Sequence, residues 1–481
     1  MEAGRDKPQV GVDDWVASVE GRRERRTGIA GLARRIDDLV PPWARLVLFA
    51  AFAASLPLWM GRGDLFAYGI FTLIYILLGL GLNVVVGYAG LLDLGYVALF
   101  GFGAYFYALL SSEHYGIHWP SAVSIPVVVV STALLGLVLG IPSRRLLGDY
   151  LAIVTLFFGQ AFVVFVNAAN PTVRGQGLTG GPNGIADIDP NDLFGYDLTT
   201  RRQQYWFILA VVVLVLIGLH LLSESRTGRA WRALREDPLA AEAMSIPVNR
   251  LKLMAFAFGA GIAGLAGCMF AAVLTAVTSG NFALPILITI YAVVILGGIG
   301  SLTGVVIGAI VINVSFQFLA PENPQDNARI LFYAAIVLLL ALSLRPWWRL
   351  AAVLGGTLVF GFAAHAFAEA VSPSWTAGAV VEGGRFAGFI SEWVIIPVGH
   401  DRFANVAYIA LVVAVLTLTR LSGWWRTLLL IPTVYLAAVV WETSFVEQPA
   451  VARWILFGSL LVFLMTVRPQ GLLGTPRVEI V

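Results

Sequence analysis

The sequence predicts an all-α polytopic membrane protein, because its apolar residues are too many for a soluble fold and fall in long unbroken runs. Of its 481 residues, 58% are hydrophobic and 12% are charged, whereas an average soluble domain has roughly 45–50% apolar and about 25% charged residues. The bilayer is therefore the expected solvent. The formal net charge of +2 argues against nucleic acid as a partner.

Apolar runs of membrane-spanning length recur along the chain, among them residues 65–86, 123–141, 206–222 and 253–277. Each is close to the ~20 residues that a helix needs to cross about 30 Å of hydrocarbon. Lipid offers the backbone no hydrogen bonds, and these runs lack the alternating pattern of a β-barrel strand. They are therefore predicted to be helices.

The first 43 residues are charged and contain no long apolar run, which predicts a cytoplasmic tail and not a signal peptide. With this tail inside, about fourteen spans alternate from residues 44–60 to residues 453–467, and both termini lie in the cytoplasm. Most lysines and arginines then fall on the inner side, as the positive-inside rule requires. Arg201 and Arg202 are exceptions. Residues 88–110 carry four glycines and are predicted to be a broken or re-entrant helix.

The chain divides into four predicted regions: a tail at 1–43, a core at 44–345, inserted extra membrane helices at 346–451, and a final span with a cytoplasmic C-terminus at 452–481. The run RILFYAAIVLLLALSLRP at 329–346 resembles RWILFGSLLVFLMTVRP at 453–469. Two interpretations stay open for this pair. It is either a weak internal repeat or a chance likeness between two leucine-rich helices.

The inner loop at 223–252 contains a short helix with recognisable ends. Asp237 suits the N-cap, Pro238 suits the first helical position, and Ile246 with Pro247 would end the run. About two turns remain between them, and so short a helix needs something to dock against. The alternative is a solvated basic loop that only follows the positive-inside rule.

Several blocks together resemble the M-type permease of branched-chain amino-acid ABC importers. They are GLGLNVVVGYAGLLDLGYVALFGFG at 79–103, GDYLAIVTLFFG at 148–159, TGGPNGI at 179–185, the loop centred on Ala240-Ala241-Glu242-Ala243, LGGIGS at 296–301 and RPQGLL at 468–473. The resemblance covers most of residues 65–319 and the last span. It implies an ABC importer permease bundle in a bacterial inner membrane, importing branched-chain amino acids or a related small polar solute such as urea or short amides.

The resemblance also implies a set of partners and a coupling helix. The partners are a second permease subunit, identical or not, two ATP-binding subunits that hold ATP and magnesium, and an extracytoplasmic substrate-binding protein. The predicted ATPase-coupling residues are Arg235, Glu236, Asp237, Pro238, Ala240, Ala241, Glu242, Ala243 and Met244. This chain itself is expected to bind no cofactor or metal.

Candidate pathway residues lie at the glycine-rich break and on a later helix: Tyr88, Gly90, Asp93 and Gln160. An intramembrane carboxylate is costly, so Asp93 is either a contact of the pathway or a cap for the segment that follows. The sequence departs from the family at Gln160, where an acidic residue is common, and at Val163 or Val164, where a basic one often follows. This helix therefore lacks the embedded charge pair on which a gating role implied by the resemblance would rest.

The outer loop holds Gly180, Gly181, Pro182, Asn183 and Gly184. Its glycines permit turns that other residues cannot adopt. Ordinary loop geometry explains them, while the resemblance implies a structured surface near the docking site of the binding protein.

No catalytic motif is found, and the chain is predicted not to be an enzyme. Its two lysines, Lys7 and Lys252, lie outside any phosphate-binding loop, and the five histidines lack metal-ligand spacing. Two alternatives to an ATP-driven permease remain: an ion-coupled secondary transporter, for which Asp93 is almost the only intramembrane carboxylate, and a membrane-embedded enzyme or scaffold.

Overall fold

The computed structural model describes residues 42–142, 148–168, 172–173, 176–193, 196–318, 326–344, 347–378, 387–398, 401–421 and 423–445, with Gly458 and Gly471. It confirms the predicted all-α fold. Within these residues, eight helices are long and apolar enough to cross a membrane, and four shorter apolar helices accompany them. Most of the predicted tail and the span at 453–467 lie outside the described residues, so the total of about fourteen spans stays a prediction.

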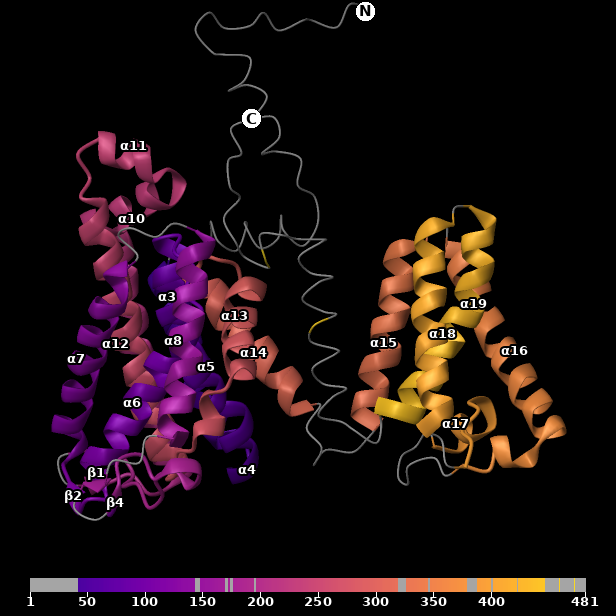
Figure 1. Cartoon of the computed structure of the whole chain (residues 1–481), viewed down its shortest axis with the longest axis horizontal. Coiled ribbons are helices and arrows are strands. Elements are labelled where there is room, and N and C mark those ends of the chain that lie inside the picture. Colours follow the sequence, from indigo (N-terminus) through magenta and orange to yellow (C-terminus); the bar gives the residue numbers. More distant parts are fainter. Residues whose placement is uncertain are drawn as a thin grey trace, which may run out of the picture.

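The helices fall into two groups, each with its own hydrophobic core, and Figure 1 shows both. The first group contains α3 (Pro42–Trp59), α4 (Arg62–Asp64), η1 (Leu65–Ile70), α5 (Phe71–Leu82), η2 (Asn83–Tyr88), α6 (Tyr96–Leu110), α7 (Ser121–Gly140), α8 (Asp149–Ala168), η4 (Gly181–Asn183), α9 (Arg201–Glu224), α10 (Arg226–Glu236), α11 (Pro238–Ala243), α12 (Val248–Leu274), η5 (Ser279–Phe282), α13 (Leu284–Gly297) and α14 (Leu302–Phe318).

Helix α12 is the centre of the first group, where it packs against α5, α6 and α7. Small residues allow this close approach. A side chain at Gly103 would begin 2.5 Å from the Cα of Gly264, and one at Gly267 would begin 2.5 Å from the backbone nitrogen of Ala104. Between membrane helices, where lipid is as apolar as leucine, such contacts of small residues favour association.

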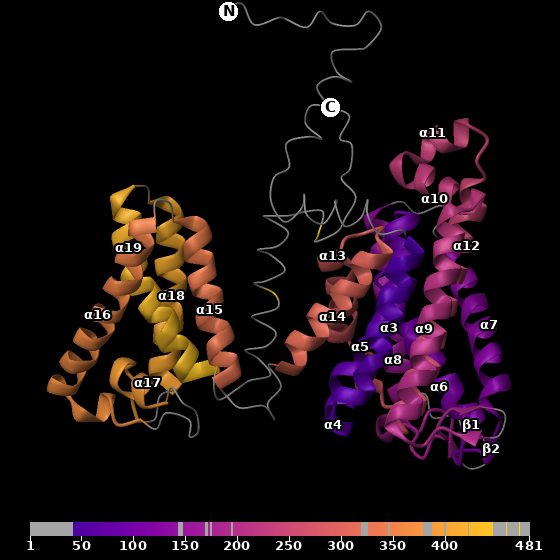
Figure 2. The same ribbon diagram turned by 180° about the vertical axis from the view of Figure 1, so that it is seen from behind.

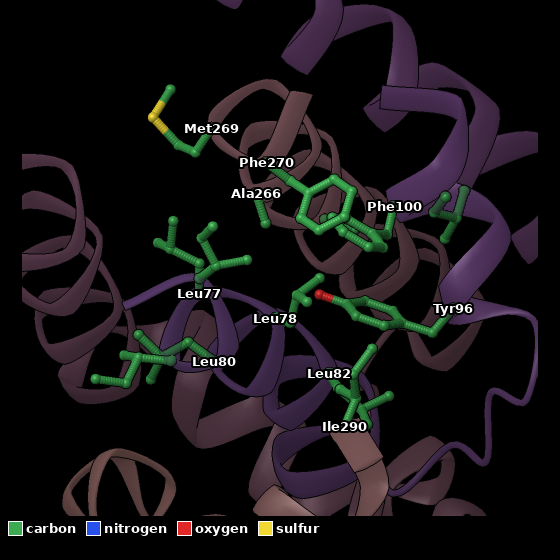
Figure 3. Packing of buried hydrophobic residues seen from close by; sticks show 14 of the residues in the cluster. Leu77, Leu78, Leu80, Leu82, Tyr96, Phe100, Ala266, Met269, Phe270 and Ile290 are labelled. Carbon is green, nitrogen blue, oxygen red and sulfur yellow. The ribbon is translucent and has the colours of Figure 1, made fainter. Parts of the chain in front are cut away.

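Larger apolar side chains fill the space around these contacts. Figure 3 shows leucines of α5 meeting Tyr96 and Phe100 of α6, Phe270 of α12 and Ile290 of α13. Phe100 and Phe270 make an edge-to-face pair with ring centroids 5.2 Å apart, a geometry that aromatic rings favour. Helix α5 is thereby enclosed on nearly all sides.

The predicted break between residues 88 and 110 is present. Two π-helical stretches, η1 and η2, flank α5 in one continuous span from Arg62 to Tyr88, and the chain then leaves helical geometry until α6 begins. Gly90, with φ of +70°, turns the backbone at the start of this break. Wide π turns free backbone carbonyls for other partners.

The two ends of the first group differ in structure. Figure 1 shows α10 and α11 at one end and short strands at the other. The strands form three antiparallel pairs: β1 (Ser111–Ser112) with β2 (Ile117–His118), β3 (Thr172–Val173) with β4 (Gln176–Gly177), and β5 (Asp192–Leu193) with β6 (Tyr196–Asp197). The arginines of α10 mark its end as the inner side.

Arg201, an exception to the positive-inside rule, is explained by its contacts. It lies at the first position of α9, where it donates to the backbone oxygen of Val273 at 2.8 Å and to Gln204 at 3.0 Å. Its guanidinium also lies 4.4 Å from the ring centroid of Phe66. Arg201 is thus part of the packing at the outer end of the bundle.

The second group is smaller, and Figure 2 shows it from behind. It contains α15 (Asp326–Ser343), α16 (Trp347–Val371), η6 (Pro373–Trp375), α17 (Ala387–Trp393), α18 (Asp401–Arg420), α19 (Trp424–Val440) and η7 (Trp441–Phe445). Helix α19 packs against α16 and α18. Residues of α17, α18 and α19 form most of its core.

Candidate functional site

The short helix predicted in the inner loop is present as α11, with the predicted cap. The carboxylate of Asp237 accepts hydrogen bonds from the backbone nitrogens of Leu239 at 2.8 Å and Ala240 at 3.1 Å, and Pro238 holds the first helical position. A cap of this kind is worth about 1 kcal/mol, a large share of the stability of a six-residue helix.

The helix ends earlier than Ile246 and Pro247 suggested. Ser245 adopts a left-handed conformation with φ of +62°, its nitrogen donates to the oxygen of Glu242, and Ile246 donates to Ala241. This pair of bonds is the Schellman motif. Met244, predicted as helical, is therefore the C-cap and not a helical residue. The hydrogen bonds of the motif, and not the proline, stop the helix.

Helix α11 presents apolar side chains to its surroundings. Leu239 is 79% exposed and Met244 is 78% exposed, whereas Ala241 is 4% exposed and faces the protein. Glu236, Pro238, Ala240, Glu242 and Ala243 are exposed as well. Figure 1 shows the helix projecting beyond the spans. Leu239 and Met244 are thus two large apolar side chains left uncovered at this end of the first group.

Helix α10 was not predicted, although its sequence carries a signal for it. Ser225 caps the helix by accepting from the nitrogen of Gly228 at 3.2 Å, and Trp231 and Leu234 follow at helical spacing on the buried face. The indole of Trp231 donates to the backbone oxygen of Leu251 at 2.9 Å. These contacts fix α10, and with it the base of α11, to α12.

Arg235, at the end of α10, joins the inner loop to the break in the span. Its guanidinium donates to the backbone oxygen of Gly87 at 2.6 Å. A side chain at Gly90 would meet Arg235 at 3.1 Å, and one at Gly300 would meet its Nη1 at 2.6 Å. The amide oxygen of Asn83 also accepts from the nitrogen of Gly300 at 2.8 Å. The inner loop, η2 and the turn after α13 thus meet at one point.

Asp93 forms a local turn and leaves one oxygen without a partner. Its Oδ1 accepts from the nitrogen of Gly95 at 2.9 Å, so the capping interpretation accounts for this atom. The Tyr291 hydroxyl donates to the Asp93 backbone oxygen at 2.6 Å. The side chain is 2% exposed, and its Oδ2 has no hydrogen-bond partner among the described residues.

The four candidate pathway residues are not all brought together. Gly90 and Asp93 lie in the break and Tyr88 ends η2 just before it; Tyr88 and Asp93 are buried. Gln160 lies on an exposed stretch of α8, with the exposed Phe157 one turn before it and Val164 one turn after it. Helix α8 reaches the break through another residue, Thr155, whose hydroxyl accepts from the nitrogen of Leu94 at 2.9 Å.

The glycines of the outer loop are required by its geometry. Gly180, Gly181 and Gly184 all have positive φ, and a side chain at Gly184 would begin 2.0 Å from the oxygen of Val277. Ile185 and Val277 exchange backbone hydrogen bonds of 3.0 and 2.9 Å. Pro182 and Asn183 are exposed at the tip of this fixed loop. These contacts hold the loop in one conformation.

A histidine absent from the predicted site links two outer segments. The Nδ1 of His118 lies 2.6 Å from the Oδ2 of Asp189, and its Nε2 lies 3.7 Å from a carboxylate oxygen of Glu113. The hydrogen bond and charge of Asp189 raise the pKa of His118 above its usual value. No sequence spacing signals this pair, because His118 and Asp189 meet only in the fold.

We expect this link to weaken at high pH. Because the folded-state pKa is raised, the stabilisation is complete below the ordinary histidine pKa of about 6.5 and is lost as pH rises through the folded pKa. Hydrogen exchange of residues 111–118 should be slower in the native chain than in His118→Asn near pH 6, by at most about fivefold, because the pair is exposed. The two should agree near pH 9. A difference that does not change with pH would contradict this prediction.

Within the described residues, no group of three or more His, Cys, Asp or Glu side chains is placed to hold a metal ion. The recognisable features are a bundle with a broken span, an exposed capped helix on its inner side, and a fixed loop on its outer side. This arrangement defines a multi-pass membrane permease.

The chain belongs to the family described as branched-chain amino acid transport system / permease component, whose model matches residues 65–341. It is 38% identical over 301 residues to the high-affinity branched-chain amino acid transport system permease protein LivM of Escherichia coli K12, covering 58% of this chain and 68% of the relative. LivM of Salmonella typhimurium LT2 is 36% identical with the same coverage. LivH of that organism is 25% identical over 198 residues, or 41% of this chain and 62% of the relative. No solved structure matches.

Proposed function

We propose that this chain is an M-type permease subunit of an ATP-driven importer for branched-chain amino acids or a related small polar solute such as urea or a short amide. The observation that carries the proposal is the α11 helix, which with its C-cap exposes Leu239 and Met244 and is fixed at its base to the spans. Similarity to the LivM and LivH permeases supports the choice of solute. ATP and magnesium act on partner subunits, and this chain binds no cofactor.

Exposed surfaces on both sides of the bundle support the predicted partners. An ATP-binding subunit would receive α11, and a second permease of the LivH type, or a second copy of this chain, would cover the exposed apolar face of α8 that includes Gln160. A substrate-binding protein would dock on the outer side at Pro182 and Asn183, which are exposed on the fixed loop. Two ATP-binding subunits complete the complex, with both termini of this chain in the cytoplasm.

The contacts of Arg235 supply a route from the ATPase to the spans. Closure of the ATP-binding subunits would move α11, and α10 would transmit the movement because Trp231 holds it to α12. Arg235 would then shift η2 and the turn at Gly300, at the break in the span. A broken helix can bend there without losing a regular ladder of hydrogen bonds, which suits alternating access.

We also propose that residues 346–451 are inserted between the core and the final span. The family match ends at residue 341, and the helices that follow share a core against which Tyr333 of α15 also packs. Gly471, in the RPQGLL block, is buried where a side chain would begin 2.5 Å from the oxygen of Ile295 in α13. Gly471 therefore lies against the core, which supports an insertion ahead of the last span.

Reconstitution of the complex in proteoliposomes tests the function. Leucine, isoleucine or valine presented with the binding protein should stimulate ATP hydrolysis and accumulate only when ATP is present on the ATPase side. Urea and short amides are tested in parallel, and the compounds that stimulate ATP hydrolysis and accumulate identify the solute. Uptake that continues without ATP while an ion gradient is maintained would overturn the proposal and favour a secondary transporter.

A further inference from the structure

Two helices of the second group begin with the same three residues. Helix α16 starts with Trp347-Trp348-Arg349, and α19 starts with Trp424-Trp425-Arg426. Trp348, Trp424 and Trp425 are all exposed. Tryptophan and arginine are the side chains that membrane proteins favour at the boundary between hydrocarbon and headgroups. Helices α16 and α19 pack against each other, so these two segments meet the bilayer surface together.

A cavity of about 110 Å³ lies between the two helices, close to these segments. We call it the WWR pocket, and its lining residues are Trp348, Arg349, Ala352, Val353, Trp424, Thr427, Leu428 and Ile431. All but Arg349 and Thr427 are apolar or aromatic. Deeper along α16 the helices approach closely, because a side chain at Gly356 would begin 2.7 Å from Ile431.

The pocket lies on the basic side of the second group. Arg349 and Arg426 lie in the first turns of α16 and α19, and Arg420 is the last residue of α18. By the positive-inside rule, this is the cytoplasmic side. The cytoplasmic leaflet carries anionic lipids, which attract arginines near the surface.

Arg349 is the residue placed to bind an anion at the pocket. Its guanidinium carbon lies 5.5 Å from the ring centroid of Trp348, which holds the cation beside an aromatic face. Among the described carboxylates, none lies within ion-pair distance of Arg349. A positive charge at the edge of an apolar cavity therefore lacks a protein counter-charge in the part of the chain that the structure describes.

We propose that the WWR pocket binds one anionic phospholipid of the inner leaflet. Arg349 would hold the phosphate, Trp348 and Trp424 would flank the glycerol region, and part of an acyl chain would enter the space beside Ala352 and Leu428. A free phosphate ion fits the arginine but leaves the apolar lining uncovered, so the lipid is the occupant that satisfies both parts of the site. The proposal does not depend on which solute the permease carries.

Native mass spectrometry of the full-length chain, purified in mild detergent, tests the site. With equal amounts of phosphatidylglycerol and phosphatidylcholine added, the native chain should retain phosphatidylglycerol preferentially. Arg349→Gln should reduce this retention about fivefold, the amount expected for one arginine near an anionic surface. Ala352→Leu, which keeps the charge and fills the cavity, should also reduce it. Inorganic phosphate should not displace the bound lipid.

Arg420→Gln is the matched control, because Arg420 is exposed at the same end of the group but does not line the pocket. It should leave lipid retention unchanged. Equal retention by Arg349→Gln and the native chain would overturn the proposal, as would an equal loss in Arg420→Gln. Displacement by inorganic phosphate would show an anion site without a lipid. Monodisperse elution of every variant confirms that the fold is intact.

Discussion

ATP-driven uptake should fall to background when Leu239 and Met244 are both replaced by aspartate. These are the two large apolar side chains that α11 and its C-cap expose, at 79% and 78%. A buried apolar anchor at a protein interface is worth about 2 kcal/mol or more, so losing both should weaken ATPase binding by at least about a thousandfold. Because neither side chain packs inside this chain, insertion and folding should be unchanged. Co-purification of the ATP-binding subunit and uptake in proteoliposomes measure the effect.

Asn249→Asp is the control for added negative charge on the inner side, since Asn249 is exposed in the first turn of α12. It should retain uptake and co-purification.

Glu242→Arg, which reverses an exposed charge on α11, should behave like the double aspartate variant. Arg235→Gln should keep the ATPase bound but lower uptake, because it removes the contact with Gly87 beyond the docking surface. Normal ATP-driven uptake in the double aspartate variant would contradict the assignment of α11.

The sequence predicted those features that depend on neighbouring residues along the chain. Apolar run length located the spans, and the Asp237-Pro238 pair located α11, because a cap and a first-turn proline act on the backbone beside them. The spacing of Trp231 and Leu234 also carried a signal for α10. It was missed because four arginines made the segment look like a solvated loop.

Contacts between distant segments could not be predicted in this way. Arg235 meets Gly87 across 148 positions of the chain, and Arg329 meets Glu442 across 113. One sequence does not state which partner a polar side chain will find, since many pairings satisfy the same charge. Gln160 illustrates the limit, because its residue type suggested a pathway but did not reveal that it lies on an exposed face of α8.

Asp93 shows that the two interpretations of one residue need not exclude each other. The turn at Gly95 accounts for Oδ1, and the unpartnered Oδ2 is unexplained by any turn or cap among the described residues. A buried polar atom without a partner costs free energy. The structure therefore supports a local structural role for Oδ1 of Asp93. Its Oδ2 is the atom left for a contact in the pathway.

A buried ion pair joins α15 to η7 in the second group. Arg329 of α15 and Glu442 of η7 are each 1% exposed, and Nη2 of the arginine lies 3.0 Å from Oε2 of the glutamate. A second bond from Nε, at 3.1 Å, makes two donors converge on that oxygen. Phe332 of α15 and Trp441 of η7 also stack, with their ring centroids 4.2 Å apart. If either partner were removed, the other charge would stay buried without a counter-charge, which is costly in an apolar setting.

Glu442→Ala should destabilise the second group by about 3–5 kcal/mol, because it leaves the Arg329 guanidinium buried without its counter-charge. The change is measured by heating each variant in detergent and recording the temperature at which monodisperse protein is lost. The double variant Arg329→Met, Glu442→Leu should be more stable than Glu442→Ala, since replacing both charges by apolar groups removes the uncompensated ion. Glu369→Ala, at an exposed carboxylate near the end of α16, is the control and should change stability little. If Glu442→Ala unfolds at the same temperature as Glu369→Ala, the ion pair does not hold η7 against α15. If the double variant is no more stable than Glu442→Ala, the destabilisation comes from the lost contact and not from the unpaired charge.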